Sequence, residues 1–252
     1  MTKDERTLSS SPDALKAARL PRPSVGGRKQ EAELKRAEKL RLERERIEGM
    51  KAYERAHADC AFICGVDEAG RGPFAGPVVA GAVILDLDDP AREILYLNDS
   101  KKLSEKKREM LFDEIMEKAV SVGVGIVERE VIDEINILQA TFLAMQKAIA
   151  ALDPQPDFIL ADAVTIPKIV IPQEGIVKGD AKSVSIAAGS IIAKVTRDRI
   201  MYEYDKLYPE YGFASHKGYG TKAHIEAIKQ YGMLDIHRRS FIHFPAAERK
   251  AE

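Results

Sequence analysis

Residues 61–85, with the sequence AFICGVDEAGRGPFAGPVVAGAVIL, decide the fold class of this 252-residue chain. An apolar run at residues 61–66 ends at Asp67 and Glu68, and a second run at residues 78–85 consists of Val, Ala, Gly, Ile and Leu. Short apolar runs bounded by Gly and Pro are typical of buried β-strands. The stretch therefore predicts two strands of one sheet, with a pair of acidic residues at the end of the first.

The rest of the chain continues the pattern of a mixed α/β domain. Further strands are predicted at residues 120–127, at 157–161 and from residue 176, and helices at residues 104–119, 137–152, 183–207 and 221–231. The first two strands follow one another directly, whereas the later ones alternate with helices. We therefore predict an α/β fold with a partly antiparallel sheet rather than a purely doubly wound one.

Composition excludes several classes of protein. Hydrophobic residues make up 45% of the chain, which is enough for one sizeable core. Two cysteines are too few for a disulfide scaffold and favour a reducing compartment. No run approaches the ~20 apolar residues of a membrane span, and residues 1–10 lack the apolar segment of a signal peptide. We expect a cytoplasmic protein that makes no contact with a membrane.

Charge is distributed unevenly, although the formal net charge is only -1. Residues 1–60 hold fifteen Lys and Arg against eleven Asp and Glu, whereas the remaining 192 residues carry a net charge of -5. Residues 1–30 combine Ser, Pro and Gly with few large apolar side chains, which predicts a disordered arm. Residues 31–60 predict a charged helical extension, because opposite charges recur three or four residues apart. Residues 61–252 then form the folded domain.

Three roles are open for residues 31–60. The first is an exposed helix that packs against the folded domain through a thin apolar stripe, which includes Leu34, Leu40, Ile47 and Met50. The basic residues of the helix could also contact nucleic-acid phosphates. A coiled-coil partner helix is disfavoured, because the heptad pattern is not sustained.

Four carboxylates occupy positions that suit a metal site. Asp67 and Glu68 follow the first predicted strand, Asp162 follows the strand at residues 157–161, and Asp180 precedes the long helix. If the two strands are parallel neighbours, Asp67 and Asp162 share the edge where open α/β sheets place their sites. Oxygen ligands alone favour Mg²⁺ or Mn²⁺ over zinc or copper, and two such ions can clamp an in-line phosphoryl displacement. Like charges this close also call for a positive group between them.

Each carboxylate also has a simpler interpretation. Asp67 can be a turn residue, Asp162 a strand terminator and Asp180 the N-cap of the following helix, since Asp is a favoured N-cap. Glu68 presents a different difficulty, because neighbouring residues on a regular strand point to opposite faces of the sheet. Glu68 can join Asp67 where the strand ends or bulges, which Gly70 makes reasonable, or it can contribute its backbone carbonyl as a ligand.

The loop after the first strand is a candidate ligand-binding element. Gly70, Arg71 and Gly72 precede Pro73, which opposes a helix. The loop does not match a dinucleotide-binding fingerprint, because its third glycine comes one position late. We predict a tight loop whose backbone approaches a ligand closely, while Arg71 points at a phosphate or pairs with an acid.

Two further loops are candidates for binding. Residues 99–102, DSKK, offer phosphate ligands or form a solvated turn. Residues 216–221, HKGYGT, leave Tyr219 open between two glycines. Its ring can be a stacking surface for a sugar or base, or it can pack on the last helix. His216 as a general base is the weaker alternative for this loop.

Four motifs occur together in one order. They are CGVDEAGRGPFAGP at residues 64–77, DSKKLS at 99–104, KGDAKSVSIAAGSIIAKVTRD at 178–198 and HKGYGT at 216–221. In this combination the chain resembles ribonuclease HII, the type 2 ribonuclease H of bacteria, over about three quarters of its length. The sister family, ribonuclease HIII, typically has Lys at the position of Arg71 and a longer, sheet-like N-terminal domain, and the sequence shows neither.

The resemblance implies a ribonuclease H-like fold for a catalytic domain at residues 61–252, with a mixed sheet flanked by helices and a helical C-terminal part. It implies that the catalytic carboxylates are Asp67, Glu68, Asp162 and Asp180, which would hold Mg²⁺ or Mn²⁺, two ions in the presence of substrate. The predicted substrate-binding residues are Gly70, Arg71, Gly72, Ser100, Lys101, Lys182 and Tyr219. The glycine-loop backbone would grip the ribonucleotide and its 2′-hydroxyl, and Tyr219 would stack on the following deoxyribose.

The implied activity is cleavage of the RNA strand of RNA/DNA hybrids and nicking 5′ of single ribonucleotides embedded in duplex DNA, with 3′-hydroxyl and 5′-phosphate products. We expect a monomer; the sequence does not say whether a sliding clamp or another replication protein recruits it. The alternatives are a ribonuclease HIII-like hybrid endonuclease and a non-catalytic nucleic-acid binding protein. Gly189 stands where the family usually has Ala, and we expect it to contact no catalytic residue.

Overall fold

The computed structural model describes residues 25–243, with side chains from residue 30 onward. The chain divides into two compact units, Met1–Leu42 and Glu43–Glu252. Helix α1 (Val25–Met50) runs through the boundary between them. The predicted disordered arm lies outside the described residues as far as residue 24, and residues 25–30 belong to α1.

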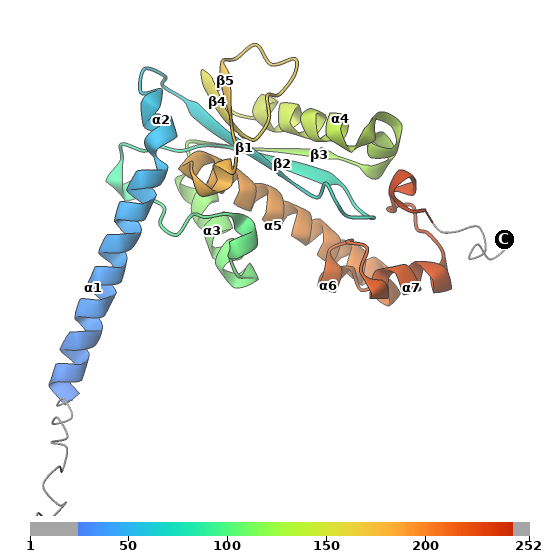
Figure 1. Ribbon diagram of the computed structural model, residues 1–252, viewed down its shortest axis with the longest axis horizontal. Helices are drawn as coiled ribbons and strands as arrows, with labels where there is room; N and C mark the ends of the chain where they lie inside the picture. Colours follow the sequence, from blue (N-terminus) through green and yellow to red (C-terminus); the bar gives the residue numbers. More distant parts are fainter. Residues whose placement is uncertain (1–24, 244–252) are drawn as a thin grey trace, which may run out of the picture. The chain divides into compact units, whose positions relative to one another are not determined.

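The second unit is built on a five-stranded sheet (Figure 1). Its strands are β1 (Ile63–Ala69), β2 (Val78–Ile84), β3 (Ser121–Val127), β4 (Phe158–Asp162) and β5 (Gln173–Ile176). They lie in the order β3-β2-β1-β4-β5. Strands β3, β2 and β1 pair antiparallel, whereas β1, β4 and β5 pair parallel. The prediction of a partly antiparallel sheet is confirmed.

Helices cover both faces of this sheet (Figure 1). Helix α4 (Arg129–Ala150) covers one face, and α3 (Glu105–Lys118) and α5 (Val184–Leu207) cover the other. The unit also contains α2 (Ala52–Ala56), α6 (Phe213–His216) and α7 (Lys222–Tyr231). On one face, Ala140 and Ala144 of α4 pack in a core with Cys64 and Val66 of β1. On the other face, α3 and α5 enclose a second core with Val83 of β2. Among the helices described, none is long and apolar enough to cross a membrane.

Side-chain caps begin three helices close to the predicted positions. Ser104 caps α3, Ser183 caps α5 and Thr221 caps α7, each by accepting a hydrogen bond from the amide three residues further on. Such a bond satisfies one of the amides that the first helical turn leaves without a partner. The cap at Ser183 shows that the N-cap interpretation of Asp180 is wrong.

Helix α4 begins at Arg129, earlier than the predicted start at residue 137. The reason is a kink at Asn136, whose φ of 69° and ψ of 163° are not helical. The Asn136 side chain accepts hydrogen bonds from the amides of Leu138 (3.0 Å) and Gln139 (3.1 Å). Asn136 thus caps the predicted segment and joins it to one further helical stretch. Strand β5 also differs from the prediction, because it ends at Ile176, the residue at which the sequence predicts a strand to begin.

The second unit begins at Glu43, which differs from the predicted boundary at residue 61. Ile47 and Met50 of α1 are buried in the core that contains Val83. The Glu43 carboxylate accepts a hydrogen bond from the backbone amide of Tyr96 at 2.8 Å. The end of the charged helix therefore belongs to the folded body, because its few apolar residues are buried there.

Helix α5 approaches the sheet closely through small residues. A Cβ added at Gly189 would lie 2.9 Å from the carbonyl oxygen of Gly81 and 3.0 Å from that of Gly65. It would also lie 3.4 Å from the backbone nitrogen of Asp67. The expectation that Gly189 contacts no catalytic candidate is therefore wrong, since it packs directly beneath the strand that carries Asp67.

Candidate active site

The parallel pairing of β1 and β4 brings two of the predicted carboxylates to one sheet edge. Val66 pairs with Ala161 in the ladder, so Asp67 and Asp162 follow at adjacent positions. Asp162 Oδ1 accepts a hydrogen bond from the Gly179 amide at 2.7 Å. This bond holds the turn Gly179–Ala181, and with it Asp180, against the same edge. The predicted juxtaposition of the strand-end aspartates is confirmed.

Glu68 joins this group although β1 continues regularly to Ala69. Glu68 pairs with Ala80 in the ladder with β2. Its carboxylate lies 3.3 Å from Arg71 Nη1, as one of the two interpretations of Arg71 predicts. The negative charges of Glu68 and Asp162 each raise the pKa of the Asp67 carboxyl. All three carboxylates therefore act within one electrostatic environment.

Burial and mutual repulsion disfavour the charged forms of these acids. Burial, together with the charges of Glu68 and Asp162, raises the pKa of Asp67 well above its usual range. Burial, with Asp99 and Asp162, raises the pKa of Asp180 to about 6. Burial also raises the pKa of Glu68, although Arg71 opposes that change. A cation is the kind of group that such an environment would bind.

Lys101 supplies the positive charge that the sequence calls for between the acids. Burial alone would lower its pKa, but the carboxylates of Asp67, Asp99, Asp180 and Asp162 outweigh burial and raise it. Lys101 is part of the turn Ser100–Lys102, in which the Asp99 side chain accepts a hydrogen bond from the Lys101 amide. The DSKK motif is therefore an ordered turn beside the carboxylates, with Ser100 buried and the two lysines exposed to solvent.

The donor set of this edge fits a hard divalent ion, because its acidic groups offer only carboxylate oxygens as ligands. Ion binding would favour the ionised forms that burial disfavours. Within residues 25–243, no three Asp, Glu, His or Cys side chains are arranged to hold an ion in this conformation.

A cavity of about 330 Å³ opens next to the carboxylate edge. It contains Glu68 and six of the seven predicted substrate-binding residues, namely Gly70, Arg71, Gly72, Ser100, Lys101 and Tyr219. Lys182, the seventh, is exposed and does not line it. Lys194 and Arg197 line the cavity and were not predicted. The signal that could have indicated them is the pair of basic residues, three positions apart, that follows the small and apolar first half of α5.

The glycine loop and the turn that carries Tyr219 are in direct contact. Gly70 has a φ of 96°, which side chains other than glycine rarely adopt. A Cβ at Gly72 would lie 3.4 Å from the Tyr219 ring. The Phe74 amide donates a hydrogen bond to the Gly218 carbonyl at 2.8 Å. Tyr219 keeps 47% of its surface exposed, so its ring is available for stacking instead of being buried on α7.

The histidines behind Tyr219 serve the structure of this turn. His216 Nε2 bonds to the Tyr211 carbonyl at 2.8 Å, and its Nδ1 accepts from the Gly218 amide at 3.2 Å. His224 Nδ1 bonds to the Tyr219 carbonyl at 2.9 Å. Both ring nitrogens of His216 are thus engaged with the backbone, which argues against a general-base role.

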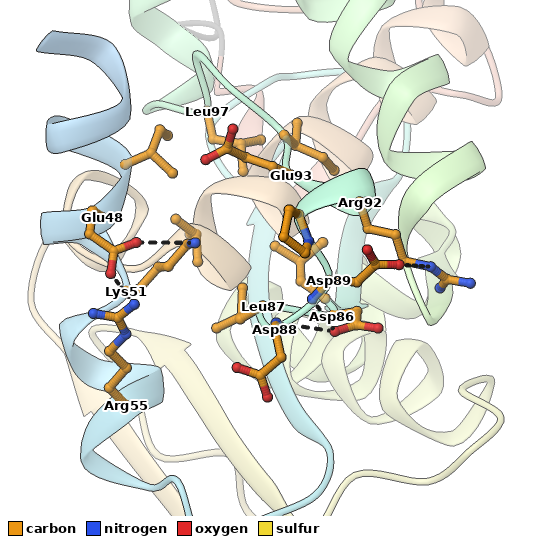
Figure 2. A pocket seen from close by; sticks show the side chains of 15 residues that line it. Glu48, Lys51, Arg55, Asp86, Leu87, Asp88, Asp89, Arg92, Glu93 and Leu97 are labelled. Carbon is orange, nitrogen blue, oxygen red and sulfur yellow. Dashed lines mark hydrogen bonds and ion pairs between the residues drawn. The ribbon is translucent and has the colours of Figure 1, made fainter. Parts of the chain in front are cut away.

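Figure 2 shows a second cavity, of about 250 Å³, between the end of α1 and residues 85–93. Glu48 forms ion pairs with Lys51 and Arg55 on the same side of this cavity. Opposite them, the Asp86 side chain accepts hydrogen bonds from backbone amides of its own loop. None of the predicted site residues lines this cavity.

Comparison with known proteins identifies the family of the chain. A family model described as Ribonuclease HII matches residues 64–244. The ribonuclease HII of Lachnoclostridium phytofermentans is 62% identical over 207 residues, covering 82% of this chain and 80% of the relative. The crystal structure of ribonuclease H2 from Pyrococcus horikoshii OT3 is similar with a TM-score of 0.59 and 32% identity, covering 71% of this chain and 93% of that one.

A third similarity is to the ribonuclease HII in a complex with PCNA from Archaeoglobus fulgidus, with a TM-score of 0.60 and 26% identity, covering 73% of this chain and 96% of that one. The fold and these matches define an endoribonuclease of the ribonuclease H class, a class that acts on RNA/DNA substrates and is in general metal-dependent. The chain belongs to the ribonuclease HII family.

Proposed function

We propose that this enzyme cleaves the RNA strand of RNA/DNA hybrids and nicks duplex DNA on the 5′ side of a single embedded ribonucleotide. The products would carry a 3′-hydroxyl on the upstream DNA and a 5′-phosphate on the ribonucleotide. The observation that carries the proposal is the cavity of about 330 Å³, which joins the glycine loop, Lys101 and Tyr219 to Glu68 at the carboxylate edge.

In this proposal Asp67, Glu68, Asp162 and Asp180 hold Mg²⁺ or Mn²⁺. A bound divalent ion would supply an activated water and stabilise negative charge on the departing oxygen. The raised pKa values of Asp67, Glu68 and Asp180 support the assignment, because a buried acidic cluster is stabilised by a cation.

The remaining cavity residues would bind and orient the nucleic acid. The 2′-hydroxyl is the main group that separates a ribonucleotide from its DNA neighbours, so its reader must approach closely. The backbone of Gly70 and Gly72 can do so because neither residue has a side chain. Tyr219, with its exposed ring, would stack on the following sugar, and Lys101 and Arg71 would contact phosphates. Lys182 stays a predicted phosphate contact outside the cavity.

Two observations bear on where and how the enzyme acts. Both cysteines of the described chain are free thiols, which supports action in the reducing cytoplasm. All elements of the proposed site come from one chain, so we propose a monomer as the active form. The archaeal relative bound to PCNA makes a sliding clamp one partner to test.

The proposal is tested by cleavage of two substrates in Mg²⁺ and then in Mn²⁺. One is a DNA duplex with a single ribonucleotide and the other is a long RNA/DNA hybrid, each also incubated with Asp67→Asn. We expect both to be cut by the wild type and neither by the variant. Cutting of the hybrid alone would favour a ribonuclease HIII-like activity, and binding without cutting of either would favour a non-catalytic role.

A further inference from the structure

Two buried arginines connect the glycine loop to the rest of the molecule. Arg197 on α5 is 1% exposed and Arg238, near the end of the described chain, is 0% exposed. Within residues 30–243 neither guanidinium forms an ion pair with a carboxylate, and both instead donate hydrogen bonds to backbone carbonyls. A buried charge is costly unless it is fully hydrogen-bonded, so these contacts fix the arginines and their partners together.

Arg238 binds the part of the loop that faces the cavity. Its Nη2 donates to the Gly70 carbonyl at 2.6 Å, its Nη1 to the Arg71 carbonyl at 3.0 Å and its Nε to the Gly76 carbonyl at 2.9 Å. The Arg238 amide also donates to the Phe74 carbonyl at 2.7 Å. One side chain from residue 238 thus fixes both ends of a loop that lies more than 160 residues earlier in the chain.

Arg197 binds the end of the loop and the turn before Tyr219. It donates to the carbonyls of Ala75, Pro77 and Lys217, each at 3.0 Å. A Cβ at Gly70 would lie 2.1 Å from Arg197 Nε, so the guanidinium packs directly beneath the loop. The glycine loop and the Tyr219 turn are therefore held by a common clamp of two cations.

The direction of these bonds determines what the loop presents to the cavity. The peptides that follow Gly70 and Arg71 are trans, so each carbonyl and the next amide point in opposite directions. With the carbonyls of Gly70 and Arg71 turned to Arg238, the amides of Arg71 and Gly72 face away from it. In the described chain these two amides donate no hydrogen bond, while their residues line the cavity.

The charge on Arg238 adds to this arrangement. A cation at the carbonyl end of a peptide polarises the group and strengthens the amide donor at its other end. Burial and the nearby Arg197 lower the pKa of Arg238 to about 9, which still leaves the guanidinium charged at neutral pH. The two amides are thus oriented and strengthened as donors before any ligand arrives.

We propose that Arg238 is a positioning residue for ribonucleotide recognition, which aims the amides of Arg71 and Gly72 at the 2′-oxygen without touching the substrate. The inference rests on the proposed function and extends it to a residue outside the cavity. Arg238 would set the preference of the enzyme for a ribonucleotide over a deoxyribonucleotide. The carboxylate edge would be unaffected by its loss.

The test measures binding in the non-cleaving Asp67→Asn protein, with and without Arg238→Met. Dissociation constants are determined for a DNA duplex with one ribonucleotide and for the identical all-DNA duplex. We expect Asp67→Asn to prefer the ribonucleotide duplex and Arg238→Met to reduce that preference about tenfold, the worth of one well-placed hydrogen bond. Binding of the all-DNA duplex should not change. Arg239→Met, which alters the neighbouring exposed arginine, is the matched control and should keep the preference.

An unchanged preference in Arg238→Met, or an equal loss of affinity for both duplexes, would overturn the inference. If thermal unfolding shows that Arg238→Met does not fold, the same ratio is measured with Arg238→Lys. Lysine keeps the charge but cannot reach three carbonyls at once, so the preference should again fall. If the Asp67→Asn parent itself shows no preference, the proposed function fails, and this inference fails with it.

Discussion

The carboxylate edge (Asp67, Glu68, Asp162 and Asp180) and the glycine loop (residues 70–77) border one cavity but are stabilised in opposite ways. At the edge, burial and repulsion raise the pKa values of Asp67 and Asp180, so the charged site is destabilising by itself. At the loop, five carbonyls accept hydrogen bonds from Arg197 and Arg238. The loop is held by hydrogen bonds within the fold, whereas ionisation of the edge carboxylates is disfavoured in the protein by itself.

The largest expected effect comes from removing a charge at the edge. Asp67→Asn should lower kcat about 10,000-fold or more, as losses of central catalytic groups do. Its melting temperature at neutral pH should be equal to or above that of the wild type, because the pKa of Asp67 is raised and its ionised form disfavours folding. Single-turnover cleavage and calorimetry of the same protein samples measure the two quantities.

Unlike Asp67→Asn, which should lose activity but not stability, a variant of the glycine loop should lose both. Gly70→Ala places a side chain at a φ of 96° and against Arg197, whose Nε would lie 2.1 Å from the new Cβ. We expect destabilisation of about 2 kcal/mol from the backbone strain and a fall in kcat/KM of about 100-fold from displacement of the loop. A denaturant titration that shows no destabilisation would contradict the clamp described for this loop.

Substitution of Lys101 and of Lys182, the two lysines predicted to bind substrate, should affect KM differently, because only Lys101 lines the cavity. Lys101→Ala should raise KM about tenfold, the worth of one charged phosphate contact. Lys182→Ala should raise KM by no more than about twofold, because its proposed phosphate contact lies outside the cavity, where solvent screens the charge. Steady-state kinetics on the single-ribonucleotide duplex decides this, and equal effects would place Lys182 on the path of the substrate.

The smallest expected effects are opposite responses to pH. Burial, with Asp99 and Asp162, raises the pKa of Asp180 from 3.8 to about 6, so its contribution to stability is lost as pH rises through about 6. Burial lowers the pKa of His237 from 6.5 to about 4, so its contribution is lost as pH falls from about 6.5 to about 4.

Scanning calorimetry of the metal-free proteins at about pH 7 and about pH 4.5 tests this pair, with shifts of about 2–4 °C expected per kcal/mol. Asp180→Asn should raise the melting temperature more at the higher pH. His237→Gln should lower it more at the higher pH, where the neutral imidazole contributes fully. Shifts that do not depend on pH in either variant would contradict the assigned pKa directions.

The sequence predicts the edge better than the clamp for a physical reason. Asp67 and Asp162 end two apolar strands, so a single assumption of parallel pairing brings them together. Arg197 and Arg238 bind backbone carbonyls, and because every residue has a carbonyl, the sequence does not mark these partners. The carbonyls that Arg238 binds also lie more than 160 residues earlier in the chain.

The differences in the fold have similar causes. The compact unit begins at Glu43, before the predicted domain, because Ile47 and Met50 are buried in a core formed largely by later residues, among them Val83. Helix α4 is longer because Asn136 joins two helical segments through a kink that a periodicity argument treats as an end. Lys182 stays a prediction from its motif, and its side chain is exposed beside the turn that places Asp180.

The most direct test of the central claim is the position and chemistry of the nick in a DNA duplex with one embedded ribonucleotide. The account predicts, in Mg²⁺ or Mn²⁺, a single nick at the 5′ side of the ribonucleotide, with a 3′-hydroxyl and a 5′-phosphate at the new ends. A nick on the 3′ side, or cutting that occurs only within continuous RNA, would contradict it.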